Sequence, residues 1–249
     1  MKLPEPAQIR GILLDIEGTT TPVEFVYRVL FPYAARELNE FIRQHFQDPE
    51  IWPFLENLRQ QRNSDSLLGL APPPWHDDSE EAEIRSLVEY GRWLMNKDSK
   101  SPSLKSLQGR IWQKGYARGE LRGQVYPDVP TSFRRWREQG KEAYIYSSGS
   151  VLAQKLLFQS TEYGDLTLLL DGFFDTEVGI KTDPGSYRMI AAQIRCEPQQ
   201  VLFISDTIGE LEGAESAGMH AAWSIRSGDT VPEPARFAVV HGFDEIFPG

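Results

Sequence analysis

Two acidic residues, Asp15 and Glu17, directly follow the apolar segment 9–14. Alternate residues of an extended chain point to the same side. In a parallel α/β sheet, ligands bind at the carboxyl ends of the strands. Carboxylates placed there could bind Mg²⁺ through oxygen, and Asp15 could attack phosphorus as a nucleophile. Glu17 could move a proton or bind the metal, and the alternative is an acidic turn that only ends a strand.

Small polar residues follow a second apolar segment, 143–146, where a helix is expected to begin. Ser147 and Ser148 precede Gly149 and Ser150. Serine hydroxyls and backbone N–H groups at the start of a helix can bind a phosphate, and glycine lets the backbone approach it closely. The alternative is an ordinary serine N-cap. The segment is therefore a candidate phosphate site only in combination with the other motifs.

A lysine and a second acidic pair complete the set of candidates. Lys181 lies just before an expected helix and could neutralise a phosphate, or it could be an ordinary surface lysine. Asp206 directly follows the apolar segment 201–204 and could complete the oxygen ligands of Mg²⁺ or cap a helix. Glu210, one helical turn later, could orient Asp206, Lys181 or a metal-bound water. Acid, hydroxyl, amine and acid follow in this order at strand or loop ends, which indicates a phosphoryl-transfer site.

Buried strands are indicated where apolar residues run without alternation. Such segments, the last of them at the edge of the sheet, lie at 9–14, 143–146, 201–204, 220–223 and 237–240. Helical spacing and glycine stops predict helices at 128–139, 151–160, 185–195 and 208–217. Because strands and helices alternate, we predict an α/β fold with a doubly wound parallel sheet.

The segment 22–123 interrupts this alternation. Apolar residues recur in it at helical spacing, and no strand-like segment intervenes. The expected helices lie at 23–42, 48–63, 84–95 and 103–118. We therefore predict a catalytic core of residues 1–21 and 124–249, with an all-helical cap inserted after the first strand. An insertion at this place is expected to act as a lid over the crevice, and the alternative is a dimerisation surface or a decoration.

The composition is that of an ordinary globular protein. The chain has 249 residues and a formal net charge of −10, which argues against nucleic acid or an anionic membrane as a partner. A small phosphorylated substrate needs only a few local cations. The single cysteine, Cys196, excludes a disulfide framework and fits a reducing compartment. With no signal-peptide pattern and no apolar segment of membrane-spanning length, we expect a cytoplasmic monomer.

The motifs of the haloacid dehalogenase superfamily of phosphatases resemble segments of this chain in the same order: Asp15 with Glu17, Ser147, Lys181, and Asp206 with Glu210. The resemblance implies a Rossmann-like core and a helical cap between the first and second motifs. The superfamily usually has Asp where this chain has Glu17. That departure, the paired serines 147–148 and the segment 115–130 resemble the enolase-phosphatase family of methionine salvage, over about residues 9–227.

This resemblance implies a bifunctional, magnesium-dependent enzyme. It would enolise 2,3-diketo-5-methylthiopentyl-1-phosphate and then remove the phosphate, which gives an acireductone. Carried over by position, the magnesium ligands would be Asp15, Glu17 and Asp206, and the substrate ligands would be Ser147, Ser148 and Lys181. Glu17 is one methylene longer than Asp, and we hypothesise that it shifts the site toward enolisation. The sequence leaves open whether Glu17 meets the metal by side chain or backbone, and whether Asp15 becomes phosphorylated.

Three other functions stay open at the level of sequence. A capped phosphatase for another small metabolite would have the same core, metal site and cap. A catalytically silent module would use the fold to bind a ligand, although every motif position here retains a chemically competent residue. A dehalogenase is disfavoured because it has no need of Asp206 as a metal ligand.

Overall fold

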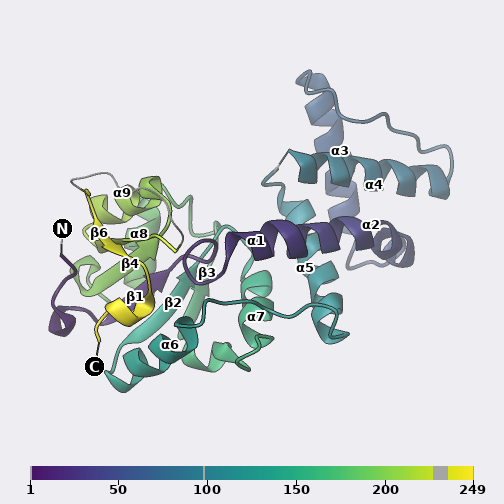
Figure 1. Cartoon of the computed structure of the whole chain (residues 1–249). Coiled ribbons are helices and arrows are strands. Elements are labelled where there is room, and N and C mark those ends of the chain that lie inside the picture. The colour runs from purple at the N-terminus through teal and green to yellow at the C-terminus, as the bar shows by residue number, and fades with distance from the viewer. Residues whose placement is uncertain (1, 98, 227–234, 249) are drawn as a thin grey trace. The chain divides into compact units, whose positions relative to one another are not determined.

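The chain forms two compact units in the computed structural model, which describes residues 2–97, 99–226 and 235–248. One unit comprises Met1–Phe25 and Arg122–Gly249, and the other comprises Val26–Leu121. The labelled strands all belong to the first unit, and the second consists of helices and their connections (Figure 1). The expected role of the helical unit as a lid stays a prediction.

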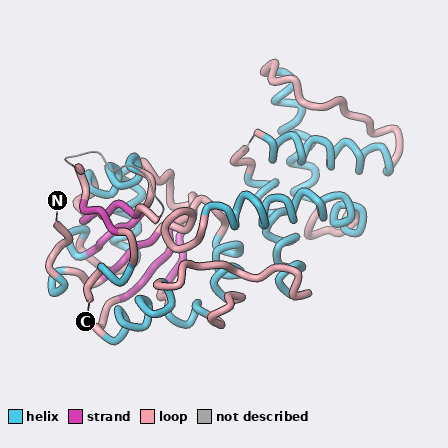
Figure 2. The backbone as a smooth tube through the Cα atoms, viewed as in Figure 1, coloured by secondary structure: helices cyan, strands magenta, loops and turns pink. Residues whose placement is uncertain are grey.

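A six-stranded parallel sheet forms the centre of the first unit among the described residues (Figure 2). Its strands are β1 (Gly11–Leu14), β2 (Glu142–Tyr146), β3 (Gly172–Phe174), β4 (Val201–Ser205), β5 (His220–Ser224) and β6 (Ala238–Val240), in the order β3-β2-β1-β4-β5-β6. The sequence order reverses between β1 and β4, where Leu14 lies opposite Ile204. Ligands of such sheets bind at the carboxyl ends of the strands beside this reversal. Asp15 and Asp206 directly follow these two strands, so the topology brings them to that edge.

Helices cover the sheet because the strands are apolar on both faces. They are α6 (Val129–Glu138), α7 (Val151–Gln159), α8 (Pro184–Gln193) and α9 (Ile208–Ser216). The unit also contains the short helix α1 (Val23–Phe25) and 3₁₀ turns at Pro6–Gln8, Leu166–Leu169, Pro198–Gln200 and Phe243–Glu245. All of β1 and β4 is buried. Leu13, Tyr146 and Phe203 form one core cluster with side chains of α8 and α9, while α6 packs against β2 and α7 against β3. The predicted α/β fold with a parallel sheet is confirmed.

One strand lies outside the sequence prediction. β3 has only three residues, Gly172–Phe174, and pairs with the end of β2 through Tyr144, Ile145 and Tyr146. A segment this short carries no measurable periodicity. The sequence prediction therefore has no strand at this place, and the sheet extends one strand further beyond β2.

The helical unit contains a π-helical turn (Val26–Leu30) and the helices α2 (Phe31–His45), α3 (Trp52–Leu67), α4 (Glu80–Asn96) and α5 (Pro102–Ala117). α2 packs against α4 and α5. The helix predicted at 48–63 is displaced: α3 begins at Trp52, and its proline lies in the first turn, where no N–H is needed. The helix predicted at 23–42 is divided by the π-helical turn. Among the described residues, no helix combines the length and apolar character needed to cross a bilayer.

Candidate active site

Asp15, Lys181 and Glu210 form a buried chain of charges in the first unit. The ammonium of Lys181 pairs with Oδ1 of Asp15 and lies 2.6 Å from Oε2 of Glu210. The side chains of Lys181 and Asp15 are 6% and 5% exposed. A charge removed from water needs partners of this kind, because an unpaired one is costly. Lys181 is thus not a solvated surface lysine.

Further polar groups fix the position of this chain of charges. Ser205, the last residue of β4, donates its hydroxyl to Oε2 of Glu210 at 2.8 Å and accepts from the backbone N–H of Thr207 at 3.1 Å. The hydroxyl of Tyr187 donates to the carbonyl of Lys181 at 2.6 Å. The positions of Ser205 and Tyr187 in the sequence give no sign of a function, and neither residue was a candidate.

The β1 loop (residues 15–21) winds around one carbonyl group. The backbone N–H groups of residues 19–21 donate to the carbonyl of Ile16, with N···O distances from 2.9 to 3.2 Å. Gly18 has φ +68°, in the left-handed region that favours glycine. A Cβ atom at Gly18 would overlap the carboxylate of Asp206. The loop therefore brings the backbone just after Glu17 directly against Asp206.

Burial and mutual repulsion raise the pKa of the carboxylates at this site. Burial first and the charge of Asp15 second raise the pKa of Glu17 to about 7. The same causes, in the same order, raise the pKa of Asp206 and of Glu210. Burial lowers the pKa of Lys181, but the charges of Asp15 and Glu210 outweigh it and the net shift is upward. The site thus gathers negative charge that one lysine compensates only in part, which favours a further cation.

The donor chemistry fits Mg²⁺. Asp15, Glu17 and Asp206 offer carboxylate oxygens, and Mg²⁺ is typically held by one or two carboxylates together with waters and substrate phosphate. Among the described residues, no group of three or more His, Cys, Asp or Glu side chains is already arranged to hold a metal ion. These three carboxylates would supply part of the coordination shell of the ion.

The serine motif lies at the end of β2. Ser147 is buried and its Oγ accepts from the backbone N–H two residues later at 3.1 Å, so its own proton is available for a ligand. Ser148 is partly exposed. Ser150 caps α7 with its hydroxyl, and the N–H of Val151 donates to Asp175 at 3.1 Å. The N-cap alternative thus describes Ser150, and a phosphate here would depend mainly on the hydroxyls of Ser147 and Ser148.

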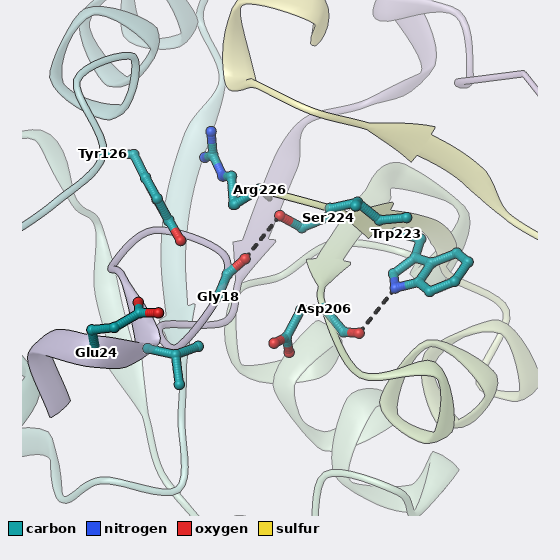
Figure 3. A pocket seen from close by; sticks show the side chains of 9 residues that line it. Gly18, Glu24, Tyr126, Asp206, Trp223, Ser224 and Arg226 are labelled. Atoms are coloured by element: carbon teal, nitrogen blue, oxygen red, sulfur yellow. Dashed lines mark hydrogen bonds between the residues drawn. The ribbon is translucent and has the colours of Figure 1, made fainter. Parts of the chain in front are cut away.

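A pocket of about 150 Å³ lies beside Asp206 (Figure 3). Besides Asp206, it is lined by Gly18, Val23, Glu24, Tyr126, Trp223, Ser224, Ile225 and Arg226. Trp223 donates its indole N–H to the carbonyl of Asp206 at 2.9 Å, and Ser224 donates its hydroxyl to the carbonyl of Gly18 at 3.1 Å. Neither Trp223 nor Ser224 was a candidate in the sequence, because both lie outside the acidic motifs.

Replacing Gly18 by Ala is expected to abolish most activity while costing little stability. The left-handed backbone costs a residue with a Cβ about 1–2 kcal/mol, and the new methyl group must also displace Asp206. We expect kcat to fall about 100-fold, since a shift of about 1 Å is enough for such a loss. Gly140→Ala is the matched control: Gly140 has φ +71° and nothing within 4 Å of a Cβ. Equal kcat in the two variants would contradict the contact with Asp206.

The metal-free protein is expected to lose stability as the pH rises from about 5 to 7. The folded pKa of Glu17, about 7, lies above the ordinary glutamate value of 4.5, so the folded state holds the proton more tightly across that window. The free energy of unfolding should therefore fall by roughly 2 kcal/mol. Urea unfolding with chelator at several pH values measures this. Glu17→Gln should flatten the slope, and the exposed control Glu162→Gln should not; equal slopes in both would contradict the shift.

Comparisons of this chain with known proteins agree on one family. A family model described as haloacid dehalogenase-like hydrolase matches residues 9–218. The enolase-phosphatase E1 of Synechococcus elongatus is 45% identical over 244 residues, which cover 98% of this chain and 100% of that protein. The enolase-phosphatase E1 of Xenopus tropicalis is 45% identical over 227 residues, covering 90% of this chain and 88% of the relative.

Solved structures give the same result for the fold. The UTR4 protein of Saccharomyces cerevisiae has a TM-score of 0.77 and 32% identity, with 96% of this chain and 100% of that chain covered. CbbY from Rhodobacter sphaeroides, solved in complex with phosphate, has a TM-score of 0.55 and 16% identity, with 96% of each chain covered. The second likeness concerns the fold alone.

Proposed function

Because this chain belongs to the haloacid dehalogenase-like hydrolases, we propose that it is the enolase-phosphatase of methionine salvage. It converts 2,3-diketo-5-methylthiopentyl-1-phosphate to the acireductone 1,2-dihydroxy-3-keto-5-methylthiopentene and phosphate. The observation that carries this is the 45% identity to an enolase-phosphatase E1 over 98% of this chain and 100% of the relative. The buried chain of Asp15, Lys181 and Glu210 supports it, because a carboxylate held beside a fixed cation can act as the nucleophile of phosphoryl transfer.

Asp15 is the proposed nucleophile for the phosphatase step. Lys181 pairs with Oδ1 of Asp15, which orients the carboxylate and offsets the charge of an arriving phosphate. A carboxylate oxygen attacks phosphorus, the bond from phosphorus to the substrate oxygen breaks, and the enol oxygen leaves as an enolate that takes a proton from water. Water then opens the acyl-phosphate, which releases phosphate and restores Asp15. Ser147 and Ser148 would donate hydrogen bonds to the phosphate oxygens.

Glu17 is the proposed group for the carbon-acid step. It lies two residues after Asp15 on the β1 loop and takes the proton from the carbon beside the ketone. Its side chain is one methylene longer than an Asp at the same place, which extends its reach toward carbon. Glu17→Asp should therefore slow enolisation more than phosphate release.

Mg²⁺ is the proposed cofactor, with Asp15, Glu17 and Asp206 as the residues that would hold it. When bound, the ion would polarise a ketone oxygen and a phosphate oxygen and lower the cost of the enolate. Glu210 would act through Lys181 rather than on the ion. A monomeric state and a cytoplasmic location are likewise proposed from the sequence.

A time course of ultraviolet absorbance tests this proposal. Purified protein is mixed with the diketone phosphate and Mg²⁺, and the reaction is repeated with chelator. We expect a metal-dependent rise of an enediol chromophore together with release of phosphate. A flat trace with phosphate released from simple esters would reassign the chain as a capped phosphatase for another metabolite. The Glu17→Asp arm should show a slower rise, and unchanged rates of both steps would refute the role of Glu17.

A further inference from the structure

We infer that Arg226 is a positioning residue that holds the β1 loop, and with it Asp15 and Glu17, in the arrangement needed for catalysis. The inference rests on the proposed function for the reaction that is affected. Arg226 lies just after β5 and belongs to none of the sequence motifs. Its side chain is 5% exposed, so its contacts are formed inside the first unit.

The guanidinium of Arg226 joins three separate segments of the chain. Its Nε donates to the carbonyl of Thr19 at 2.9 Å, and its Nη1 binds Oδ2 of Asp128 at 2.6 Å. Its Cζ lies over two aromatic rings, 4.5 Å from the centroid of Tyr126 and 4.4 Å from that of Phe243. A planar cation with several donors suits this environment, whereas a lysine ammonium could not make the same contacts together.

Arg226 is one of three clamps on consecutive carbonyl groups of the β1 loop. The carbonyl of Gly18 accepts from the hydroxyl of Ser224 at 3.1 Å, and the carbonyl of Thr20 accepts from the backbone N–H of Tyr126 at 3.0 Å. The carbonyl of Thr19, between them, is the one that Arg226 binds. Figure 3 shows Tyr126, Arg226 and Ser224 close together beside Gly18. Of the three clamps, Arg226 is the charged one, and charge-assisted hydrogen bonds are the strong ones.

Hydrogen bonds within the β1 loop connect the contact of Arg226 to catalysis. The N–H groups of residues 19–21 all donate to the carbonyl of Ile16, between Asp15 and Glu17. The loop is therefore bound on one side to the backbone between Asp15 and Glu17 and on the other side to Arg226. A loop released at Thr19 would loosen the turn that holds Gly18 against Asp206. When catalytic groups are held in place in this way, a small displacement of them lowers the rate strongly.

The test compares Arg226→Met with Arg135→Met as a matched control. Arg135 also binds backbone carbonyls, those of Phe243 at 2.6 Å and Ile246 at 3.1 Å, but it contacts no residue of the β1 loop. Both variants therefore remove a partly buried arginine that contacts Phe243. Amide hydrogen exchange of peptides covering the loop reads its conformation directly, without reference to the reaction. Steady-state kinetics on the diketone phosphate gives kcat and KM.

We expect Arg226→Met to speed exchange in the β1 loop about tenfold or more and to lower kcat about tenfold, with a smaller change in KM. Arg135→Met should lower Tm without either effect, and Arg226→Lys should fall between wild type and Arg226→Met. Should Arg226→Met fail to fold, Arg226→Lys decides. If Arg226→Met and Arg135→Met have the same hydrogen exchange in the β1 loop and the same kcat, the inference is overturned. Because exchange is independent of substrate, inactivity of the wild type on the diketone would count against the proposed function alone.

Discussion

Replacing Asp15 by Asn is expected to reduce phosphate release by at least about 1,000-fold, because the nucleophilic oxygen is lost while the shape of the side chain is kept. The folded state should survive. Asp15 raises the pKa of Glu17, Asp206 and Glu210 through its negative charge, and its removal relieves that repulsion. Lys181 keeps Glu210 as a partner at 2.6 Å. Activity should therefore fall without a fall in Tm.

Phosphate release and thermal unfolding of Asp15→Asn measure both halves of this prediction. Asp78→Asn, at an exposed position, is the control for the same chemical change. Retention of more than about a tenth of the wild-type kcat would exclude Asp15 as the nucleophile, since loss of such a group typically costs far more. A large drop in Tm would instead show that Asp15 is needed for folding.

Replacing Lys181 by Met is expected to remove activity and also to destabilise the protein by about 3–5 kcal/mol at neutral pH. The reason is that two buried carboxylates, Asp15 and Glu210, lose the cation between them. Urea unfolding gives the free energy, and phosphate release gives the activity. The loss of stability should shrink at acidic pH, because protonated carboxyls no longer need a counter-charge.

The double variant Lys181→Met with Glu210→Gln is the control for this explanation. It removes one of the two unpaired charges, so it should recover part of the lost stability but none of the activity. If the double variant is no more stable than Lys181→Met, the repulsion between Asp15 and Glu210 is not the cause. If Lys181→Met retains wild-type activity, the lysine has no role in binding or orienting the reacting groups.

The sequence predicts that Asp15 and Asp206 lie at strand ends because each follows a local signal. Asp15 and Asp206 come directly after apolar segments, and a buried parallel strand is the simplest fold for such segments. The contact of Lys181 with Asp15 is not local, and only the order of motifs indicates it. The metal and substrate roles of these residues stay predictions.

Other parts of the fold and site have no local signal. β3 is too short to show a period. Arg226 and Tyr126 act by stacking and by binding loop carbonyls, and they lie roughly a hundred or more residues from the loop that they hold. Carbonyl groups are present at every position, so no residue pattern reveals which ones need a partner. Contacts of this kind are determined by the packed fold.

The reversal of strand order beside β1 also has a consequence for the newly made chain. β1 is synthesised first, yet its two hydrogen-bonded neighbours begin only at Glu142 and Val201. Until β4 has been made, the apolar segment of β1 has one edge without a partner and is open to wrong pairing or to capture by a chaperone. Pairings so distant in sequence also form slowly. Catalysis therefore cannot begin before β4 has been made, and a chain that is cut short before β4 is a candidate for aggregation and degradation rather than for partial activity.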